Sequence, residues 1–560
     1  MATNKKPNFL IIVADDLGYS DIKPFGGEID TPCLDELAKD GTLLTNFHTA
    51  SACSPTRSML FSGTDNHIAG LGQMAEMARG PEYKNHPGYE GYLNFRVAAL
   101  SEVLQDAGYY CASSGKWHLG TTAETSPHAR GFDDSFALLA GCSNHYNFEP
   151  QLDKPEDKVF TPLNAAKFWM ENDKFLDRTK DLPSDFYSST TFADKLVDYL
   201  SLRKQNDQHK DKPFFAYLPF TAPHWPLQAP KDLIAKYKGR YDDGPYALRE
   251  KRLQGLKDLG LIPQDVDAAP MTGYKEERAW AHMAPEERAA SARKMEVFAA
   301  MVESMDQSIA TVITHLKQTA ELDNTFILFM SDNGAEGAFL EAMPVMGGED
   351  SVNSIINHYY DNSLANIGAA DSFVWYGAEW ACAATAPSRG YKCWITEGGI
   401  RCPCLVRYPR AISSQVKITN SFATVMDIFP TMLELAGVPL PGPSFRGREV
   451  VPIRGASWVP HLTGQHGEFH GEETVITGWE LMGGRAIREG RFKALSMPPP
   501  RGMGEWELYD VEDDPGEVRD LAGLEEWRGV LERLKELWQV YYFETGLFDV
   551  GHRFPFAELE

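Results

Sequence analysis

Two continuous apolar segments of strand length place the strictest limit on the folds that this chain can adopt. They lie far apart in the sequence. They run from Asn8 to Ala14 and from Thr325 to Met330. Unbroken apolar runs of this length are typical of strands buried on both faces of a sheet. Shorter runs at 43–47, 109–113 and 214–218 alternate with helical patterns at 33–40, 96–106 and 298–316. This alternation predicts an α/β fold, with a large doubly wound sheet flanked by helices.

The C-terminal part of the chain follows a different pattern. A stretch rich in proline and glycine, Pro439 to Pro443, is typical of a linker, and short strand-like runs at 491–495 and 505–510 then precede a helix at 527–541. We therefore expect a main α/β domain over 1–440 and a C-terminal α+β subdomain with a small antiparallel sheet over 441–560. Segments 145–190 and 225–285 lack periodicity and are predicted to be irregular, and 336–385 is predicted to be a long loop insertion.

The charge balance excludes two classes of partner. The 560 residues contain 54 Lys and Arg against 79 Asp and Glu, a net charge of −25, which argues against nucleic acid and against an anionic membrane surface. The first apolar run is too short for a secretory signal or a membrane span. The eight cysteines show no disulfide or zinc spacing. We therefore expect a cytoplasmic protein with reduced thiols and no membrane association.

Both long apolar runs end in residues with oxygen-bearing side chains. Asp15 and Asp16 follow the first run, and Asp332 and Asn333 follow the second. In an open α/β sheet, ligands bind at the carboxyl ends of the strands. Carboxylate and amide oxygens without His suit Ca²⁺ or Mg²⁺ rather than zinc. The alternative is that each pair merely forms a turn after its strand, since Asp-Asp-x-Gly and Asp-Asn-Gly are good turn sequences.

The segment Ala52-Cys53-Ser54-Pro55-Thr56-Arg57 brings a thiol and a cation together. Ser54 followed by Pro55 predicts a helix start, with Ser54 as the cap and Gly63 as the stop. Cys53 would then lie at a helix N-terminus, where anions are favoured, and Arg57 would add a positive charge suited to an oxyanion. A buried structural cysteine is the alternative. A tyrosine-phosphatase-like thiolate fits less well, because those enzymes separate Cys and Arg by five residues, and here only three intervene.

The hexamer resembles the Cys-x-Pro-x-Arg signature of type I sulfatases, a family within the alkaline-phosphatase superfamily. Three further segments resemble the same family: Gly115-Lys-Trp-His-Leu-Gly120, Ala222-Pro-His-Trp-Pro226 and Thr396-Glu-Gly-Gly-Ile-Arg401. The likeness extends to Trp506-Glu-Leu-Tyr-Asp510 and is greatest to bacterial-type cytoplasmic arylsulfatases. It implies an alkaline-phosphatase-like fold with a large mixed sheet.

The resemblance also implies a modified residue and a metal ion. In this family a maturation enzyme oxidises the signature cysteine, here Cys53, to formylglycine, whose aldehyde hydrate is the nucleophile. A divalent cation, normally Ca²⁺ with Mg²⁺ as the alternative, is held by four side chains and by the hydroxyl of residue 53. By position, these four side chains belong to Asp15, Asp16, Asp332 and Asn333.

The remaining catalytic positions carry over in the same way. Lys116 would hold a sulfate oxygen, and His118, two residues on and on the same side of an extended segment, would take a proton from the hydrate. His224 and Lys392 would assist the departing oxygen, and Asp332 would be the base for the attack. Outside the resemblance, His224 is more simply a loop residue and Lys392 a solvated lysine.

We therefore expect hydrolysis of small-molecule sulfate monoesters, with aryl sulfates favoured. A phosphonate or phosphate ester hydrolase on the same scaffold is the main alternative. A protein that binds sulfate esters without cleaving them, because Cys53 stays unoxidised, is a second, and a thiol hydrolase is a third. The aromatic residues of the 336–385 insertion would either line a pocket for an aryl group or pack as a surface lid. These residues are Phe373, Trp375, Tyr376 and Trp380.

Overall fold

A mixed ten-stranded β-sheet forms the centre of the computed structural model, which describes residues 5–153, 168–273, 276–337, 352–413, 416–465, 467–470 and 475–548. The strand order is β11-β2-β10-β9-β1-β8-β4-β5-β6-β7. In chain order the strands are β1 (Asn8–Ala14), β2 (Thr42–Leu44), β4 (Tyr110–Lys116), β5 (Asp134–Leu138), β6 (Trp169–Glu171), β7 (Lys174–Phe175), β8 (Phe214–Pro219), β9 (Thr325–Ser331), β10 (Cys404–Arg407) and β11 (Ile418–Thr419).

The two apolar runs that set the fold form neighbouring central strands. β1 pairs in parallel with β8 on one side and with β9 on the other. Its side chains alternate between two cores, with Leu10 and Ile12 on one face of the sheet and Phe9, Ile11 and Val13 on the other. The stretch of β1 from Phe9 to Ala14 therefore contains no polar residue because both of its faces are buried.

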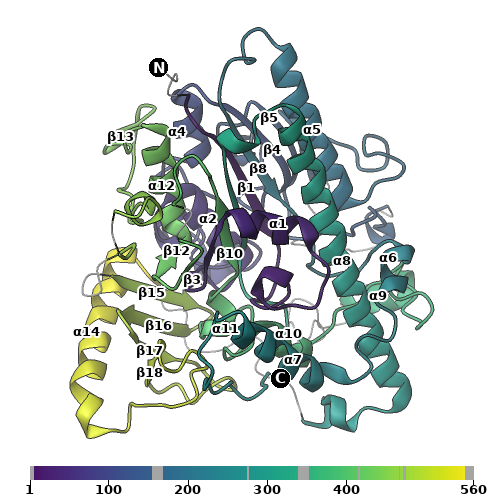
Figure 1. Ribbon diagram of the computed structural model, residues 1–560, viewed down its shortest axis with the longest axis vertical. Helices are drawn as coiled ribbons and strands as arrows, with labels where there is room; N and C mark the ends of the chain where they lie inside the picture. Colours follow the sequence, from purple (N-terminus) through teal and green to yellow (C-terminus); the bar gives the residue numbers. More distant parts are fainter. Residues whose placement is uncertain are drawn as a thin grey trace.

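Helices cover both faces of this sheet, as Figure 1 shows, and the doubly wound α/β prediction is confirmed. One layer contains α1 (Pro32–Asp40), α5 (Ser188–Gln205) and α8 (Pro285–Gln318). The opposite layer contains α2 (Cys53–Ser62), α4 (Leu100–Asp106) and α12 (Ile428–Ala436). The apolar stripe of α8, from Phe298 to Leu316, packs into the first core, as its periodicity predicts.

The segments predicted to be irregular contain more regular structure than expected. Strand β6 extends the sheet antiparallel to β5, and β7 pairs antiparallel with β6. Helices α6 (Lys231–Lys236) and α7 (Gly244–Asp258) occupy part of 225–285. Of the 336–385 insertion, residues 338–351 lie outside the described residues, and the rest includes α9 (Val352–Tyr359) and α10 (Ala378–Thr385). Every residue of α10 is buried, so the helix has no polar face and no amphipathic pattern that could reveal it.

The C-terminal part forms a separate antiparallel sheet with one long helix packed against it, drawn in yellow and yellow-green in Figure 1. Its elements are β15 (Ile476–Leu481), β16 (Gly484–Glu489), β17 (Phe492–Ser496), β18 (Glu507–Asp510) and α14 (Arg528–Thr545). The core between them contains Ile487, Leu508, Leu534 and Trp538. Upstream, Trp458 and Leu462 pack into the main core beside α12. The boundary at residue 440 stays a prediction.

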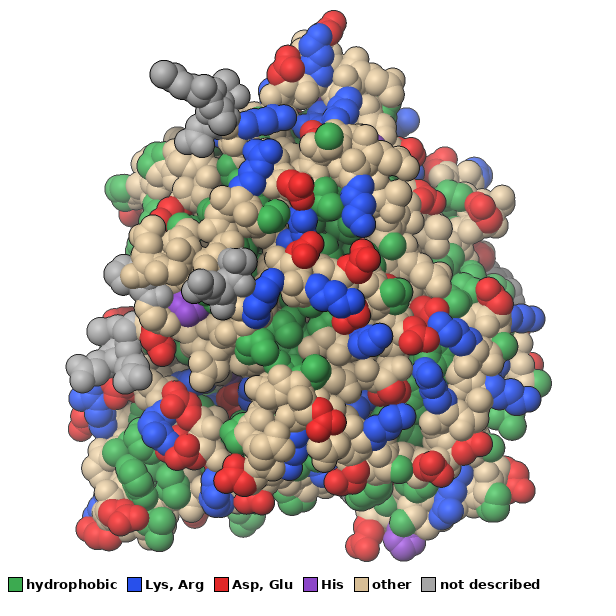
Figure 2. Space-filling view, viewed as in Figure 1, with side chains coloured by type: hydrophobic (Ala, Val, Ile, Leu, Met, Phe, Trp, Pro, Cys, Tyr) green, Lys and Arg blue, Asp and Glu red, His purple; other side chains and the backbone are tan. Residues whose placement is uncertain are grey.

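Shorter elements connect these layers. They are β3 (Phe47–His48), β12 (Ala423–Thr424), β13 (Ser444–Phe445), β14 (Arg448–Glu449), α3 (Asn66–Ala69), α11 (Glu397–Ile400) and α13 (Val459–Leu462). Acidic and basic side chains are interspersed over the face drawn in Figure 2. Among the helices in the described ranges, none has the length and apolar character needed to cross a lipid bilayer.

Candidate active site

Four side chains with oxygen donors meet at the carboxyl ends of the central strands. Because β1 and β9 are parallel neighbours in register, the pairs that follow them, Asp15-Asp16 and Asp332-Asn333, emerge side by side. All four residues are at most 1% exposed. The backbone N–H of Asp16 donates to Asp332 Oδ1 at 3.2 Å. Asp16 has a left-handed backbone with φ of 66°, which is uncommon for a residue other than glycine.

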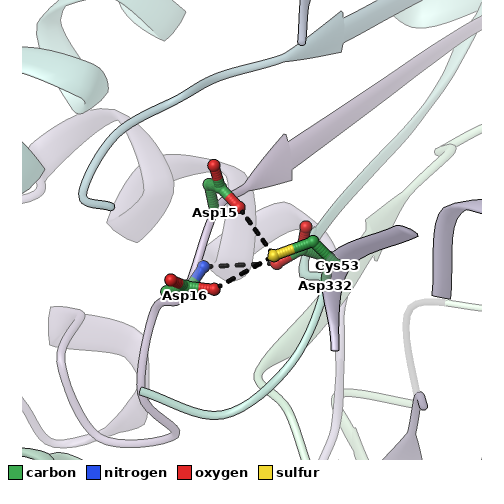
Figure 3. Close-up of side chains that lie close together, drawn as sticks. All are labelled: Asp15, Asp16, Cys53 and Asp332. Carbon is green, nitrogen blue, oxygen red and sulfur yellow. Dashed lines mark hydrogen bonds between the residues drawn. The ribbon is translucent and has the colours of Figure 1, made fainter. Parts of the chain in front are cut away.

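Cys53 is the first residue of α2, and its sulfur points toward these carboxylates (Figure 3). Its Sγ lies 3.2 Å from Asp15 Oδ1 and 3.3 Å from Asp16 Oδ1. The N-cap is Ala52, so the prediction that Ser54 caps the helix is wrong. Ser54 instead lies in the first turn, where its hydroxyl accepts a hydrogen bond from a backbone N–H of a neighbouring loop. The predicted stop at Gly63 is the observed C-cap.

The surroundings of Cys53 do not favour a thiolate. Burial, and then the carboxylates of Asp16 and Asp332, raise the pKa of the Cys53 thiol well above its ordinary value. A thiol hydrolase and a tyrosine-phosphatase-like enzyme both need a depressed thiol pKa. This environment therefore argues against the two thiolate hypotheses.

Three buried cations balance the three carboxylates. The pairs are Lys116 Nζ with both oxygens of Asp15 at 2.8 Å, an Arg57 terminal nitrogen with Asp332 Oδ2 at 2.8 Å, and Lys392 Nζ with Asp16 Oδ2 at 2.8 Å. Arg57 also donates to the backbone carbonyl of Lys116 at 2.9 Å. Because these side chains are at most 5% exposed, three fixed cations lie inside the site, each paired with a carboxylate, although the chain as a whole is acidic.

The donor set around Cys53 fits a hard divalent cation. Ligand atoms of Asp15, Asp16, Cys53 and Asp332 lie within 4.8 Å of one another. Asn333 Nδ2 donates to Asp16 Oδ1 at 2.7 Å, but its buried Oδ1 has no partner. Burial raises the pKa of Asp15 to about 7, with Asp332 and Asp16 adding to the rise and Lys116 opposing it. A cation would relieve this repulsion and would occupy the unpaired amide oxygen.

His118 lies beyond the end of β4, next to a glutamate that the sequence did not single out. β4 ends at Lys116 and His118 has φ of 57°, so the expectation of an extended segment through both residues is wrong. His118 Nε2 is 2.9 Å from Glu76 Oε1, and Nδ1 is buried without a partner. Glu76 lies in a connection of irregular sequence, and only the tertiary fold brings it to the histidine.

His224 and Lys392 both reach the carboxylate of Asp16. His224 Nδ1 donates to the carbonyl of Trp225 at 2.7 Å, and Nε2 lies 3.4 Å from Asp16 Oδ2. Burial lowers the pKa of His224 well below its ordinary value, which favours the neutral ring. Lys392 also contacts Glu336 Oε2 at 2.9 Å, a second acidic residue that no sequence pattern identified. The structure thus brings every candidate site residue into one region.

An aromatic cluster adjoins His224. Its aromatic members, Trp225, Tyr360, Phe373 and Trp375, pack around Ile356. The rings of His224 and Trp225 are 4.6 Å apart, and those of Trp225 and Phe373 are 5.8 Å apart. The other two aromatic residues proposed for a pocket lie elsewhere, because Tyr376 stacks on Phe298 at 4.7 Å and Trp380 is 1% exposed in the main core.

Known proteins resemble this chain over most of its length. Residues 7–438 match the family model described as Sulfatase, and residues 390–541 match the model for the C-terminal region of N-sulphoglucosamine sulphohydrolase. An uncharacterized sulfatase of Schizosaccharomyces pombe is 55% identical over 549 residues, which cover 98% of this chain and 95% of the relative. An arylsulfatase of Klebsiella aerogenes is 36% identical over 462 residues, covering 81% and 92%.

Solved structures share the fold at low sequence identity. The crystal structure of Ps i-CgsB in complex with a neocarrahexaose has a TM-score of 0.66 at 21% identity, covering 98% of this chain and 94% of that one. A structure solved with its substrate D-glucosamine-2-N,6-O-disulfate has a TM-score of 0.59 at 19% identity, covering 97% and 98%. At this identity, the likeness defines the architecture alone.

Proposed function

We propose that this chain, which belongs to the sulfatase family and is a sulfuric ester hydrolase, acts on sulfate monoesters of phenols. One observation carries the proposal. Three buried cations and a set of hard oxygen donors converge on the side chain of residue 53, beside an aromatic cluster. Such a site offers fixed positive charge to a sulfuryl group and an apolar surface to the group that leaves.

Two additions would complete the site. Oxidation of Cys53 to formylglycine by a maturation enzyme, followed by addition of water to the aldehyde, would supply a hydroxyl nucleophile, and a bound Ca²⁺ would polarise a sulfate oxygen. The oxygens of Asp15, Asp16, Asp332 and Asn333 would hold the ion. Calcium is proposed because the donors are carboxylate and amide oxygens, and Mg²⁺ is the alternative.

The chain's own residues would then position and move protons. Asp332 accepts the proton of the attacking hydroxyl, and His118 Nδ1 accepts the proton whose removal releases sulfate. Lys392 Nζ, a charged donor, stabilises the ester oxygen through a hydrogen bond as the bond to sulfur breaks. His224 presents an unprotonated Nε2, because its Nδ1 proton is directed to the Trp225 carbonyl, so it orients the substrate instead of donating to it.

The aromatic cluster supports an aryl leaving group. Trp225 lies beside His224, and Phe373 lies beside Trp225. His224 and Lys392 both contact Asp16, so these rings adjoin the region where Lys392 would meet the ester oxygen. Flat aromatic groups pack favourably against such rings. The arylsulfatase of Klebsiella aerogenes, at 36% identity, agrees with this substrate class.

Matched esters test the proposal. We would express the full chain with a formylglycine-generating enzyme, verify residue 53 by peptide mass, and add Ca²⁺. We expect 4-nitrophenyl sulfate to be cleaved at least 100-fold faster than the phosphonate ester of the same phenol, and faster than a sulfated monosaccharide. Cys53→Ala, the matched control, should lack activity. Chelation should remove the wild-type activity, and Ca²⁺ should restore it.

Each contrary result has a definite meaning. Faster phosphonate cleavage would identify a phosphonate ester hydrolase. Preference for the sulfated sugar would overturn the aryl substrate. An unmodified thiol at residue 53 together with full activity would overturn the formylglycine nucleophile, and an unmodified thiol without activity would identify a sulfate-ester-binding protein.

A further inference from the structure

A carboxylate and an imidazole form a pair at the edge of the site. Glu76 Oε1 and Oε2 lie 2.9 and 3.1 Å from His118 Nε2. The side chain of Glu76 is 32% exposed, whereas that of His118 is 6% exposed. The glutamate is thus the more exposed member of the pair.

The pair fixes which nitrogen of His118 carries the proton. Burial alone would raise the pKa of Glu76, but the charge of His118 and its hydrogen bond together lower this pKa to about 2. An ionised carboxylate only accepts hydrogen bonds, so the proton lies on Nε2. Nδ1 then carries the lone pair, and it is buried without a protein partner. The left-handed backbone of His118 is a strained conformation of the kind that clusters at active sites.

Gly141 provides the space for this contact. A Cβ atom at this position would lie 2.7 Å from Glu76 Oε1 and 2.8 Å from His118 Cε1 and Nε2. Even a methyl group would therefore push the carboxylate and the ring apart. Gly141 is not among the glycines with positive φ, so its backbone conformation does not itself require glycine.

Apart from Glu76, the described charges with the largest effect on the pKa of His118 are positive. Lys116 and Arg57 oppose protonation of the ring, and so does burial, which has the largest effect in lowering the pKa of His118. Glu76 is the neighbour that opposes this lowering. If His118 accepts a proton during the reaction, the Glu76 carboxylate is placed to stabilise the imidazolium.

We propose that Glu76 is a positioning residue of the reaction, which holds His118 with Nδ1 free and compensates the charge when Nδ1 takes a proton. The inference rests on the proposed function. A proton moves from a hydroxyl at residue 53 to Nδ1, while the Nε2 proton stays in its hydrogen bond to Glu76. Glu76 touches neither the substrate nor the cation in this role.

Replacing the charge alone gives the first test. In Glu76→Gln the amide oxygen can still accept from Nε2, but the negative charge is lost. We expect kcat on 4-nitrophenyl sulfate to fall about 10- to 100-fold, as for other groups that assist a general base, with KM changed less than threefold. The acidic limb of the kcat profile should move to lower pH. Glu82→Gln, an exposed carboxylate of the same connection, is the matched control and should leave both quantities unchanged.

Replacing Gly141 gives an independent test of geometry. Gly141→Ala leaves every charge in place and should lower kcat about tenfold by separating the pair. In a Glu76→Ala background the carboxylate is absent and only the contact of the new methyl group with the His118 ring remains, so the same change should cost less than in the wild type. Additive losses would overturn the inference, because they would show that Gly141 acts independently of Glu76.

A spectroscopic measurement separates this inference from the proposed function. In histidine-selective ¹⁵N NMR of the wild-type protein, the signal lost in His118→Gln should have the shifts of an Nε2-protonated ring, and Glu76→Ala should alter them. Normal kcat and pH profile in Glu76→Gln, or an Nδ1-protonated ring in the wild type, would overturn the role of Glu76. Absence of any sulfatase activity in the mature wild type would instead overturn the proposed function.

Discussion

Two buried groups of charged residues differ in how completely their hydrogen bonds are satisfied. The catalytic cluster comprises Asp15, Asp16, Asp332, Arg57, Lys116 and Lys392. The interface cluster comprises His48, Glu397, Lys493 and Glu517, which link β3 and α11 of the main domain to the C-terminal sheet. Both are nearly inaccessible to water. Beside the catalytic cluster, Asn333 Oδ1 and His118 Nδ1 are buried without partners, whereas the charged side chains of the interface cluster contribute none of the unpartnered atoms found among the described residues.

The interface cluster is closed within the protein. Lys493 Nζ lies 2.9 Å from Glu397 Oε1 and 2.8 Å from Glu517 Oε1. His48 Nε2 reaches Glu397 Oε2 at 2.8 Å, and the backbone N–H of Glu397 donates to Glu517 Oε2 at 2.8 Å. All four carboxylate oxygens thus have protein donors. A complete network contributes rigidity, whereas an incomplete one leaves polar atoms that a ligand can satisfy.

The largest effect should come from breaking the closed network. Lys493→Met would leave Glu397 and Glu517 buried without their ammonium ion, so we expect the free energy of unfolding to fall by about 3–5 kcal/mol. Urea denaturation would measure the change, and turnover per folded molecule should stay within twofold of the wild type. Lys535→Met, on the exposed face of α14, should change stability by less than about 0.5 kcal/mol. A fully stable Lys493→Met protein would contradict the structural role of the interface cluster.

A substitution in the catalytic cluster should lower enzymatic activity more than it lowers the stability of the fold. Lys116→Ala removes the cation beside Asp15, and we expect turnover to fall about 100-fold or more, as for other preorganised oxyanion donors. This corresponds to about 2.7 kcal/mol of activation free energy. Steady-state kinetics in Ca²⁺ would measure it, with peptide mass verifying formylglycine. Near-normal turnover with complete modification would show that the two clusters do not differ in function.

A third network of charged residues tests, with a smaller expected effect, whether closed networks stabilise the fold. His67 Nδ1 lies 2.8 Å from Asp65 and Nε2 lies 3.2 Å from Glu480, while the Tyr541 hydroxyl of α14 donates to Asp65. Burial lowers the pKa of His67, but Asp65 and Glu480 raise it to about 9. Because the folded pKa lies above the ordinary value, the stabilisation is complete below about pH 6.5 and is lost as the pH rises through 9.

Wild type and His67→Gln compared across pH isolate this contribution. The stability difference between them should shrink by about 2 kcal/mol from pH 7 to pH 9. Thermal or urea unfolding at each pH measures it, and the subtraction cancels groups common to both proteins. A difference that grows with pH would show that His67 is neutral in the folded protein.

The sequence identified the residues whose position follows from local patterns. Asp15 and Asp332 stand directly after apolar runs, and an uninterrupted run places its last residue at a known edge of the sheet. Glu76 and Glu336 were not found, because each reaches its partner through tertiary packing between segments without periodicity. The start of α2 was misplaced because Ser54 satisfies a neighbouring loop instead of its own helix.

The insertion at 336–385 shows that parts of the fold also cannot be predicted from local sequence patterns. Its aromatic residues were considered together from composition, yet Trp380 belongs to a fully buried helix, whereas Phe373 adjoins His224 through Trp225. Strands β6 and β7 have three and two residues, too few to show an alternation of polar and apolar side chains. Their place in the sheet depends on their partners.

The burial of Cys53 limits the time during which a maturation enzyme can reach its side chain. Its side chain is 2% exposed once Asp15 and Asp332 are in place, so an oxidising enzyme has access only while the site is incomplete. Asp332 leaves the ribosome about 280 residues after Cys53, a delay on the order of tens of seconds at usual elongation rates. The proposed modification therefore competes with the completion of the polypeptide, and slower translation between these positions would increase the share of active molecules.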